Sequence, residues 1–377
     1  INSSFNILYM EIIIFIIPFI TAAILVWKFR KETVWWEYIV LILPSLLFAL
    51  LMEFAFKSSN TSDIEYLGDY VTKVTYYEEW DEMVWVTHTR RVYAGSDSKG
   101  RPRYRTETYR VLERKYHPER WEYRTAHDSW AHRINKAMFQ TITRALAVEP
   151  VFIDMNRNYH SIDGDVYEWN FSGDPNRSYS VTDAHRYSNP IKGSRSTFKF
   201  EKITDEEAKK LGLFNYNEIV NLDQSPIQGI KVGPYQERKI RWINGYYGPE
   251  KQFRMYMLFF KNQSEAIAEK QRSYWEGGNK NELVCCVGLD KANKITWVRC
   301  FSWEDTPHLS VKSQNWLLTH SLGLSKFSEY ITPLIQKEWR RKQFDDFSYL
   351  SIEISDGQYI ALLIMILLYN IGISIWL

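Results

Sequence analysis

The residues with the clearest chemical potential are three cysteines, Cys285, Cys286 and Cys300, which lie in two neighbouring apolar segments. We expect these segments to form an antiparallel strand pair. A two-residue turn at Ala292 and Asn293 places Cys285 opposite Cys300, close enough for a disulfide. Buried free thiols that act as small apolar side chains are the alternative. Because the chain has no C-x-x-C spacing, the sequence does not predict a zinc site.

Three long apolar segments frame the sequence, residues 7–27 and 38–56 near its start and 359–377 at its end. At about 1.5 Å per residue, each of them as a helix matches the hydrocarbon core of a bilayer, which is roughly 30 Å thick. A helix satisfies its own backbone hydrogen bonds, which lipid cannot do for it. We therefore expect three transmembrane helices, with membrane lipid as one partner of the chain.

Two polar side chains fall inside these segments, Glu53 in the second and Asn370 in the third. Polar groups at such depth are candidates for an ion or proton path, which would make the chain an accessory subunit of a channel or transporter. Glu53 lies close to Lys57, so an ion pair at the membrane surface is the simpler expectation. An amide facing lipid is costly, and Asn370 is therefore expected to face another helix.

The composition of the rest of the chain is that of a water-soluble protein. Outside the apolar segments about 300 residues remain, which is enough to bury a sizeable core. The net charge of the chain is +2, which gives no reason to expect nucleic acid as a partner. No nucleotide-binding loop, metal-ligand spacing or nucleophile motif stands out, so we expect neither a metal nor another cofactor.

The sequence divides into a transmembrane hairpin at residues 1–57, a β-rich region at 58–260, an α-β-β-α region at 261–358 and a last transmembrane helix at 359–377. The expected fold is α+β, a large mixed soluble domain rich in antiparallel hairpins on membrane anchors. The short connector between the first two helices, residues 28–32, is basic. By the positive-inside rule it faces the cytoplasm, which places residues 58–358 on the extracytoplasmic side.

Local patterns predict several elements within the soluble part. The expected elements are a polar linker at 58–69, a long exposed hairpin at 70–93 and 103–116, a helix within 128–146, loops and short strands at 213–250, and a last strand at 347–354.

The return strand of the long hairpin mixes basic and aromatic residues. The candidate contact residues are Arg103, Tyr104, Arg105, Tyr109 and Trp121. Such a surface can bind a partner protein, an anionic surface or single-stranded nucleic acid, and an extracytoplasmic location disfavours the last. The alternative is a solvated strand whose charges protect its edge from pairing.

The part of the chain at residues 265–350 resembles the TPM-type domain of membrane-anchored extracytoplasmic proteins. The resemblance rests on a helix leading to Trp275, a turn at Gly277-Gly278-Asn279, the apolar strand at 283–287 and a Pro333 segment. It implies an extracytoplasmic domain and a hydrolase activity of the phosphatase type.

The polar residues that follow the second strand are Glu304, Asp305 and His308, and the resemblance makes them the catalytic candidates. The segment at 301–305 stands where the family has a glycine motif. Residues 66–121 are also similar to uncharacterised membrane-anchored proteins of tailed phages and bacteria, a resemblance that carries no function.

Together these patterns favour a non-catalytic structural or binding subunit of a membrane complex, which presents an extracytoplasmic domain to other subunits. The TPM-like hydrolase and the channel or transporter subunit are the two alternatives.

Overall fold

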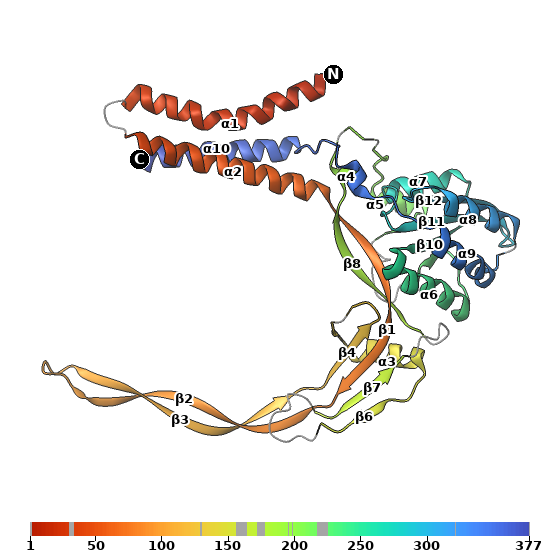
Figure 1. Ribbon diagram of the computed structural model, residues 1–377, viewed down its shortest axis with the longest axis horizontal. Helices are drawn as coiled ribbons and strands as arrows, with labels where there is room; N and C mark the ends of the chain where they lie inside the picture. The colour runs from red at the N-terminus through yellow and green to blue at the C-terminus, as the bar shows by residue number, and fades with distance from the viewer. Residues whose placement is uncertain are drawn as a thin grey trace.

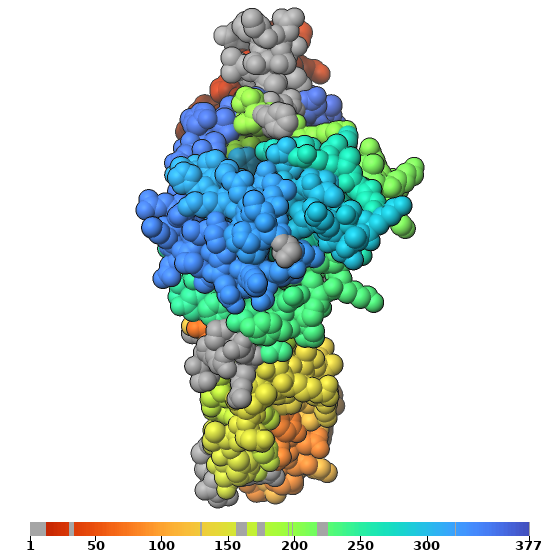
Figure 2. Space-filling model, turned by 90° about the vertical axis from the view of Figure 1, so that its right-hand side faces the viewer, coloured from red at the N-terminus to blue at the C-terminus, as the bar shows by residue number. Residues whose placement is uncertain are grey.

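The computed structural model describes the backbone at residues 2–29, 34–128, 130–155, 164–171, 178–194, 196–197, 199–216, 225–320 and 322–376, with side chains from residue 13 onward. Figure 1 shows a curved, elongated molecule in which one long strand joins a helical bundle to two globular parts. Figure 2, seen from the side, shows the part coloured green to blue between the helices above and the yellow strands below.

The elements of the first half are α1 (Asn2–Phe29), α2 (Trp35–Thr61), β1 (Ser62–Tyr77), β2 (Trp80–Ser96), β3 (Pro102–His117), β4 (Arg120–Thr125), β5 (His132–Ile134), α3 (Lys136–Leu146), β6 (Val151–Ile153), β7 (Val166–Asn170), β8 (Ser180–Ser188) and α4 (Pro190–Gly193). Those of the second half are α5 (Asp205–Leu211), β9 (Ile227–Gln228), α6 (Pro234–Lys251), β10 (Arg254–Lys261), α7 (Ala266–Tyr274), β11 (Glu282–Leu289), β12 (Ile295–Ser302), α8 (His308–Thr319), α9 (Leu324–Glu338), η3 (Phe344–Phe347) and α10 (Asp356–Trp376).

The helices α1, α2 and α10 lie side by side (Figure 1). Within the described residues, two helices are long and apolar enough to cross a membrane, α2 with a mean hydropathy of 2.4 and α10 with 2.1. For α1, residues 13–29 form a shorter apolar helix. The outward faces of all three helices carry exposed large apolar side chains, as expected of helices that lie against lipid.

Strand β1 connects the main parts of the molecule. Its first half pairs with β8, and its second half pairs with β4 on one side and β7 on the other. We call the sheet β5-β4-β1-β7-β6 the distal sheet, and α3 packs on it through Ile142 and Leu146. The connection from α2 to this distant sheet is therefore one continuous strand.

The polar linker expected at residues 58–69 is wrong. Residues up to Thr61 continue α2, and β1 begins at Ser62. Asn60 joins the last turn of α2 to the start of α10. Its Nδ2 donates to the carbonyl of Glu353 and to Oε1 of Gln358, each at 3.0 Å. These partners lie almost three hundred residues away in sequence, so a local pattern could not reveal them.

The second globular part is an α/β unit, which we define as β9–β12 with α5–α9. Its sheet has the order β12-β11-β10-β9, with β10 and β11 parallel and β11 and β12 antiparallel. Helices α6, α8 and α9 cover one face, and α7 covers the other. Because β10 belongs to this sheet, the unit extends across the boundary expected at residue 260.

Helix α6 corrects the prediction of loops and short strands at residues 213–250. It begins with Pro234 after Gly233, a favourable first position for proline. Ile240, Ile243 and Tyr247 are buried against the sheet. The glycines and the proline near its end indicate a loop when they are considered locally, whereas packing keeps the segment helical.

Two smaller expectations also change. The segment expected to be a last strand at 347–354 has none, because only η3 and an irregular stretch precede α10. The helix expected within 128–146 begins at Lys136, since residues His132–Ile134 pair with β4 as β5.

The expected long hairpin is confirmed for residues 80–93 and 103–116 as the two-stranded sheet β2–β3, whereas residues 70–77 belong to β1. We call residues 80–117 the arm. Its strands pair in continuous antiparallel register from Trp80 opposite His117 to Tyr93 opposite Tyr104. The arm projects from the distal sheet to the same side of the molecule as the helices (Figure 1).

Candidate functional site

Strand β1 and helix α6 touch at the level of their backbones. A Cβ on Gly248 would lie 2.1 Å from the carbonyl oxygen of Gly68, and a Cβ on Gly68 would lie 2.3 Å from that of Asn244. Asn244 also joins α6 to β10, because its side chain accepts from the amide of Met255 at 2.8 Å and donates to its carbonyl at 3.0 Å. Glycines at this crossing are therefore a steric requirement.

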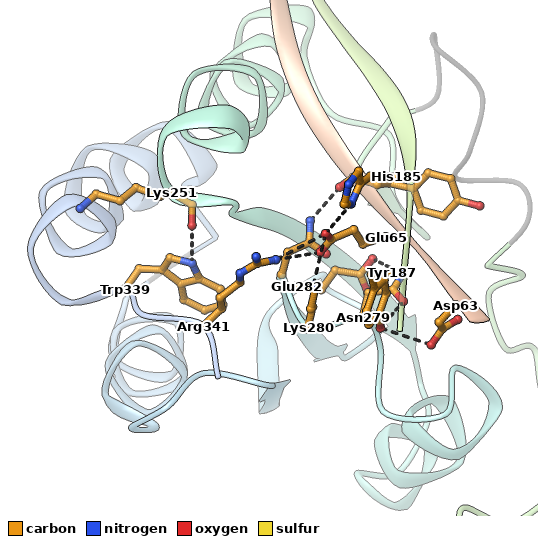
Figure 3. Close-up of polar contacts among 12 residues, drawn as sticks. Asp63, Glu65, His185, Tyr187, Lys251, Asn279, Lys280, Glu282, Trp339 and Arg341 are labelled. Atoms are coloured by element: carbon orange, nitrogen blue, oxygen red, sulfur yellow. Dashed lines mark hydrogen bonds and ion pairs between the residues drawn. The ribbon is translucent and has the colours of Figure 1, made fainter. Parts of the chain in front are cut away.

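A buried carboxylate, Glu65, lies next to this crossing on β1 (Figure 3). Its oxygens contact Nδ1 of His185 at 3.0 Å, Nη1 of Arg341 at 3.1 Å and Nζ of Lys280 at 3.6 Å. The three cationic or imidazole groups come from β8, from the segment after α9 and from the turn before β11. Burial lowers the pKa of Lys280, and Glu65 opposes that shift. One carboxylate thus joins the α/β unit to the β1–β8 ribbon.

A second polar cluster lies beside it. Tyr216 donates to the buried carboxylate of Glu282, and the backbone amide of Asn279 donates to the same group at 2.8 Å. Burial raises the pKa of Glu282, and these hydrogen bonds oppose the shift. Tyr187 donates to Asp63 at 3.2 Å and to Asn279 at 3.4 Å, and burial raises its pKa. We call the groups around Glu65 and Glu282 the buried polar junction.

A cavity of about 970 Å³ opens beside this junction. Its walls combine Tyr66, Tyr216 and Asn279 with basic residues such as Lys199 and acidic residues such as Glu201. Because the lining mixes both signs of charge with aromatic rings, its chemistry does not select one class of ligand.

The cysteine register is confirmed, since Cys285 pairs with Cys300 across β11 and β12. Their Sγ atoms lie 3.2 Å apart as free thiols, and Cys286 points into the opposite core beside α7. The hydrogen bond with Cys285 and burial raise the pKa of Cys300, and burial raises that of Cys286. Such thiols are poor nucleophiles. Within the described residues no group of three His, Cys, Asp or Glu could hold a metal ion.

We predict that Cys285 and Cys300 form a disulfide when residues 282–302 lie in an oxidising compartment. The two residues are 15 positions apart, and closing a loop of that length contributes about 3 kcal/mol by restricting the unfolded chain. Mass spectrometry of an unreduced digest should find the linked peptides. Alkylation of all three thiols in protein from intact cells would contradict both the bridge and an oxidising location.

The three catalytic candidates have different surroundings in the structure. Glu304 is buried and accepts the backbone amides of Leu309 at 3.1 Å and Ser310 at 2.9 Å, which places its charge at the start of α8. Asp305 lines a cavity of about 470 Å³ with arginines from the segment after α9, and His308 is exposed on α8. The carboxylate of Glu304 is thus occupied in stabilising a helix end.

The two polar residues of the apolar segments find partners inside the chain. Glu53 pairs with Lys57 at 2.5 Å, as expected. Asn370 is buried, and its Nδ2 donates to Oγ of Ser45 at 2.9 Å and to the carbonyl of Ile366 at 2.8 Å. The helix that Asn370 faces is this chain's own α2, so the residue provides no argument for a partner helix.

Four of the five expected contact residues lie on the arm. Arg103, Tyr104, Arg105 and Tyr109 are all exposed on β3. Trp121 does not join them, because it lies on β4 of the distal sheet. There its ring stacks on Tyr76 at a centroid distance of 6.0 Å.

The sequence reasoning missed the apolar residues near the base of the arm. Met83 and Trp85 on β2 are 57% and 67% exposed, and Leu112 on β3 is 43% exposed. Trp85 and Leu112 face each other across the two strands. The available signal was the continuous apolar run at residues 83–86 of β2, but in an ordinary sheet such a run indicates a buried strand.

No protein-family model, curated protein or solved structure matches this chain.

Proposed function

We propose that this chain is a non-catalytic structural or binding subunit of a membrane complex, anchored by α1, α2 and α10, with the arm as its contact surface for other protein. The observation that supports this proposal is the exposure of the arm. Nearly every residue of β3 is exposed, and so are the large side chains Trp85 and Tyr93 on β2. Among the residues that the structure describes, no third strand pairs with this ribbon and no helix covers it. A two-stranded ribbon of this kind is marginally stable in water. Contact with another protein would supply the missing burial.

The charges of the arm exclude lipid as its covering. Arg105 and Arg110 differ by an odd number of positions on β3, so they point to opposite faces. A charged group on each face makes insertion costly, and the two strand edges leave backbone groups that lipid cannot satisfy. An arm that runs on the same side as the membrane helices (Figure 1) therefore requires water or protein around it.

The test is photo-cross-linking in intact membranes. A photoreactive phenylalanine analogue in place of Trp85 should form an adduct with another protein chain. The same analogue at Tyr235, which is 52% exposed at the start of α6, is the matched control and should give little adduct. Absence of any adduct at Trp85, together with a monomer of 45.0 kDa in native mass measurement from mild detergent, would overturn the proposal.

We further propose that the α/β unit lies on the extracytoplasmic side, with three membrane spans. The basic connector after α1 and the resemblance to TPM-type domains support this orientation. A cysteine in place of Lys291, exposed in the turn between β11 and β12, should label with an impermeant reagent in intact cells. A cysteine in place of Lys28 should label only after permeabilisation. Labelling in the reverse pattern would contradict the orientation.

A further inference from the structure

The two edges of the arm carry opposite charge where they leave the distal sheet. On β2 the first residues include Asp81 and Glu82, whereas the facing end of β3 carries Arg114 and Lys115. Within the arm these residues already pair, with Arg114 bound to Asp81 and Lys115 lying 3.5 Å from Glu82. One edge is thus acidic and the other basic at the same height.

The complementarity between the side chains of β2 and β3 continues along the strands. Trp85 lies opposite Leu112, Val86 opposite Val111, and Arg90 contacts Glu107 at 3.2 Å. Lysine and arginine on a strand edge ordinarily prevent pairing with another chain. Here β2 carries its acids at Asp81 and Glu82 and its bases at Arg90 and Arg91, so an edge that presents β3 at the same height places Lys115 opposite Glu82 and Glu107 opposite Arg90.

Membrane anchoring decides which edge a second copy presents. Copies in one membrane are related by rotation about the membrane normal, so their arms have the same height and the same direction relative to α2 and α10 (Figure 1). In that arrangement β3 of one copy is antiparallel to β2 of the next and in the register already seen inside the arm. Contact between two β2 edges would instead set parallel strands side by side, with Asp81 against Asp81.

We infer that the protein contacting the arm is the arm of a second copy of this chain, added edge to edge so that β2 of one copy pairs with β3 of the next. This inference rests on the proposed function and identifies the partner. Strand addition satisfies the backbone groups of both edges and extends the two-stranded ribbon into a wider sheet. The contact is heterologous, so repeating it closes a ring or propagates along the membrane.

Disulfide cross-linking between differently tagged copies tests the inference. Thr89 and Thr108 are opposite each other in the arm, and opposite positions in a ladder suit a disulfide. Membranes containing both Thr89→Cys and Thr108→Cys chains, oxidised with a copper catalyst, should give an adduct that carries both tags. Each variant alone should give several-fold less, and the unmodified chain measures the background from the native cysteines. Equal adducts from one variant alone, or no mixed adduct, would overturn the inference.

Charge reversal adds a second readout. Glu82→Lys should reduce the mixed adduct several-fold, and pairing it with a copy that carries Lys115→Glu should restore it. The outcomes separate the two proposals. If the analogue at Trp85 captures a different protein while Thr89 and Thr108 stay unlinked, the proposed function stands and the partner is not a second copy. If neither method gives an adduct, both proposals fail.

Discussion

Gly248→Ala is expected to destabilise the junction between β1 and α6 by about 1–3 kcal/mol, because overpacking at a rigid contact has a cost of that size. The new methyl group would lie 2.1 Å from the carbonyl oxygen of Gly68, and a backbone atom cannot rotate away as a side chain can. Either β1 moves off the helix or α6 shifts on its sheet. The first shift opens the contact between β1 and α6, and the second breaks the Asn244 contacts with β10.

Thermal unfolding in detergent, followed by tryptophan fluorescence, measures this effect. Gly357→Ala is the matched control, since nothing lies within 4 Å of a Cβ placed there and α10 gains a better helix former. The control should unfold at or above the temperature of the unmodified protein. Equal unfolding temperatures for the two variants would show that β1 and α6 are not in backbone contact.

Glu65→Gln is expected to have the larger effect, about 3–5 kcal/mol, because it leaves buried cations without their countercharge. The side chains of Lys280 and Arg341 are only 13% and 14% exposed. The amide cannot offset their charge, and the β1–β8 ribbon then loses its ion pairs with Lys280 and Arg341 of the α/β unit. Limited proteolysis between the ribbon and the unit should become faster in the variant.

Glu201→Gln provides the comparison, since its partner Lys270 and the acid itself are 40% and 57% exposed. An exposed pair of this kind contributes at most about 1 kcal/mol. A double variant, Glu65→Gln with Lys280→Gln, should recover part of the loss because one uncompensated cation is gone. The prediction fails if Glu65→Gln and Glu201→Gln unfold alike.

The features predictable from the sequence are those that depend on near neighbours in the chain. The apolar composition of α2 and α10 is sufficient to identify helices able to cross a membrane. The alternation and the turn of the arm predict a hairpin, and a tight turn sets the register that brings Cys285 opposite Cys300. Each of these depends on periodicity or on a turn a few residues long.

Tertiary structure alone decided the features that join distant segments. Helix α6 contains glycines and a proline that locally predict a loop, and it is helical because Ile240, Ile243 and Tyr247 pack on a sheet. The role of Glu65 depends on partners from three other segments, since a buried carboxylate is tolerable only where cations converge on it. Such contacts are set by the approach of residues far apart in the chain, and no local pattern encodes that approach.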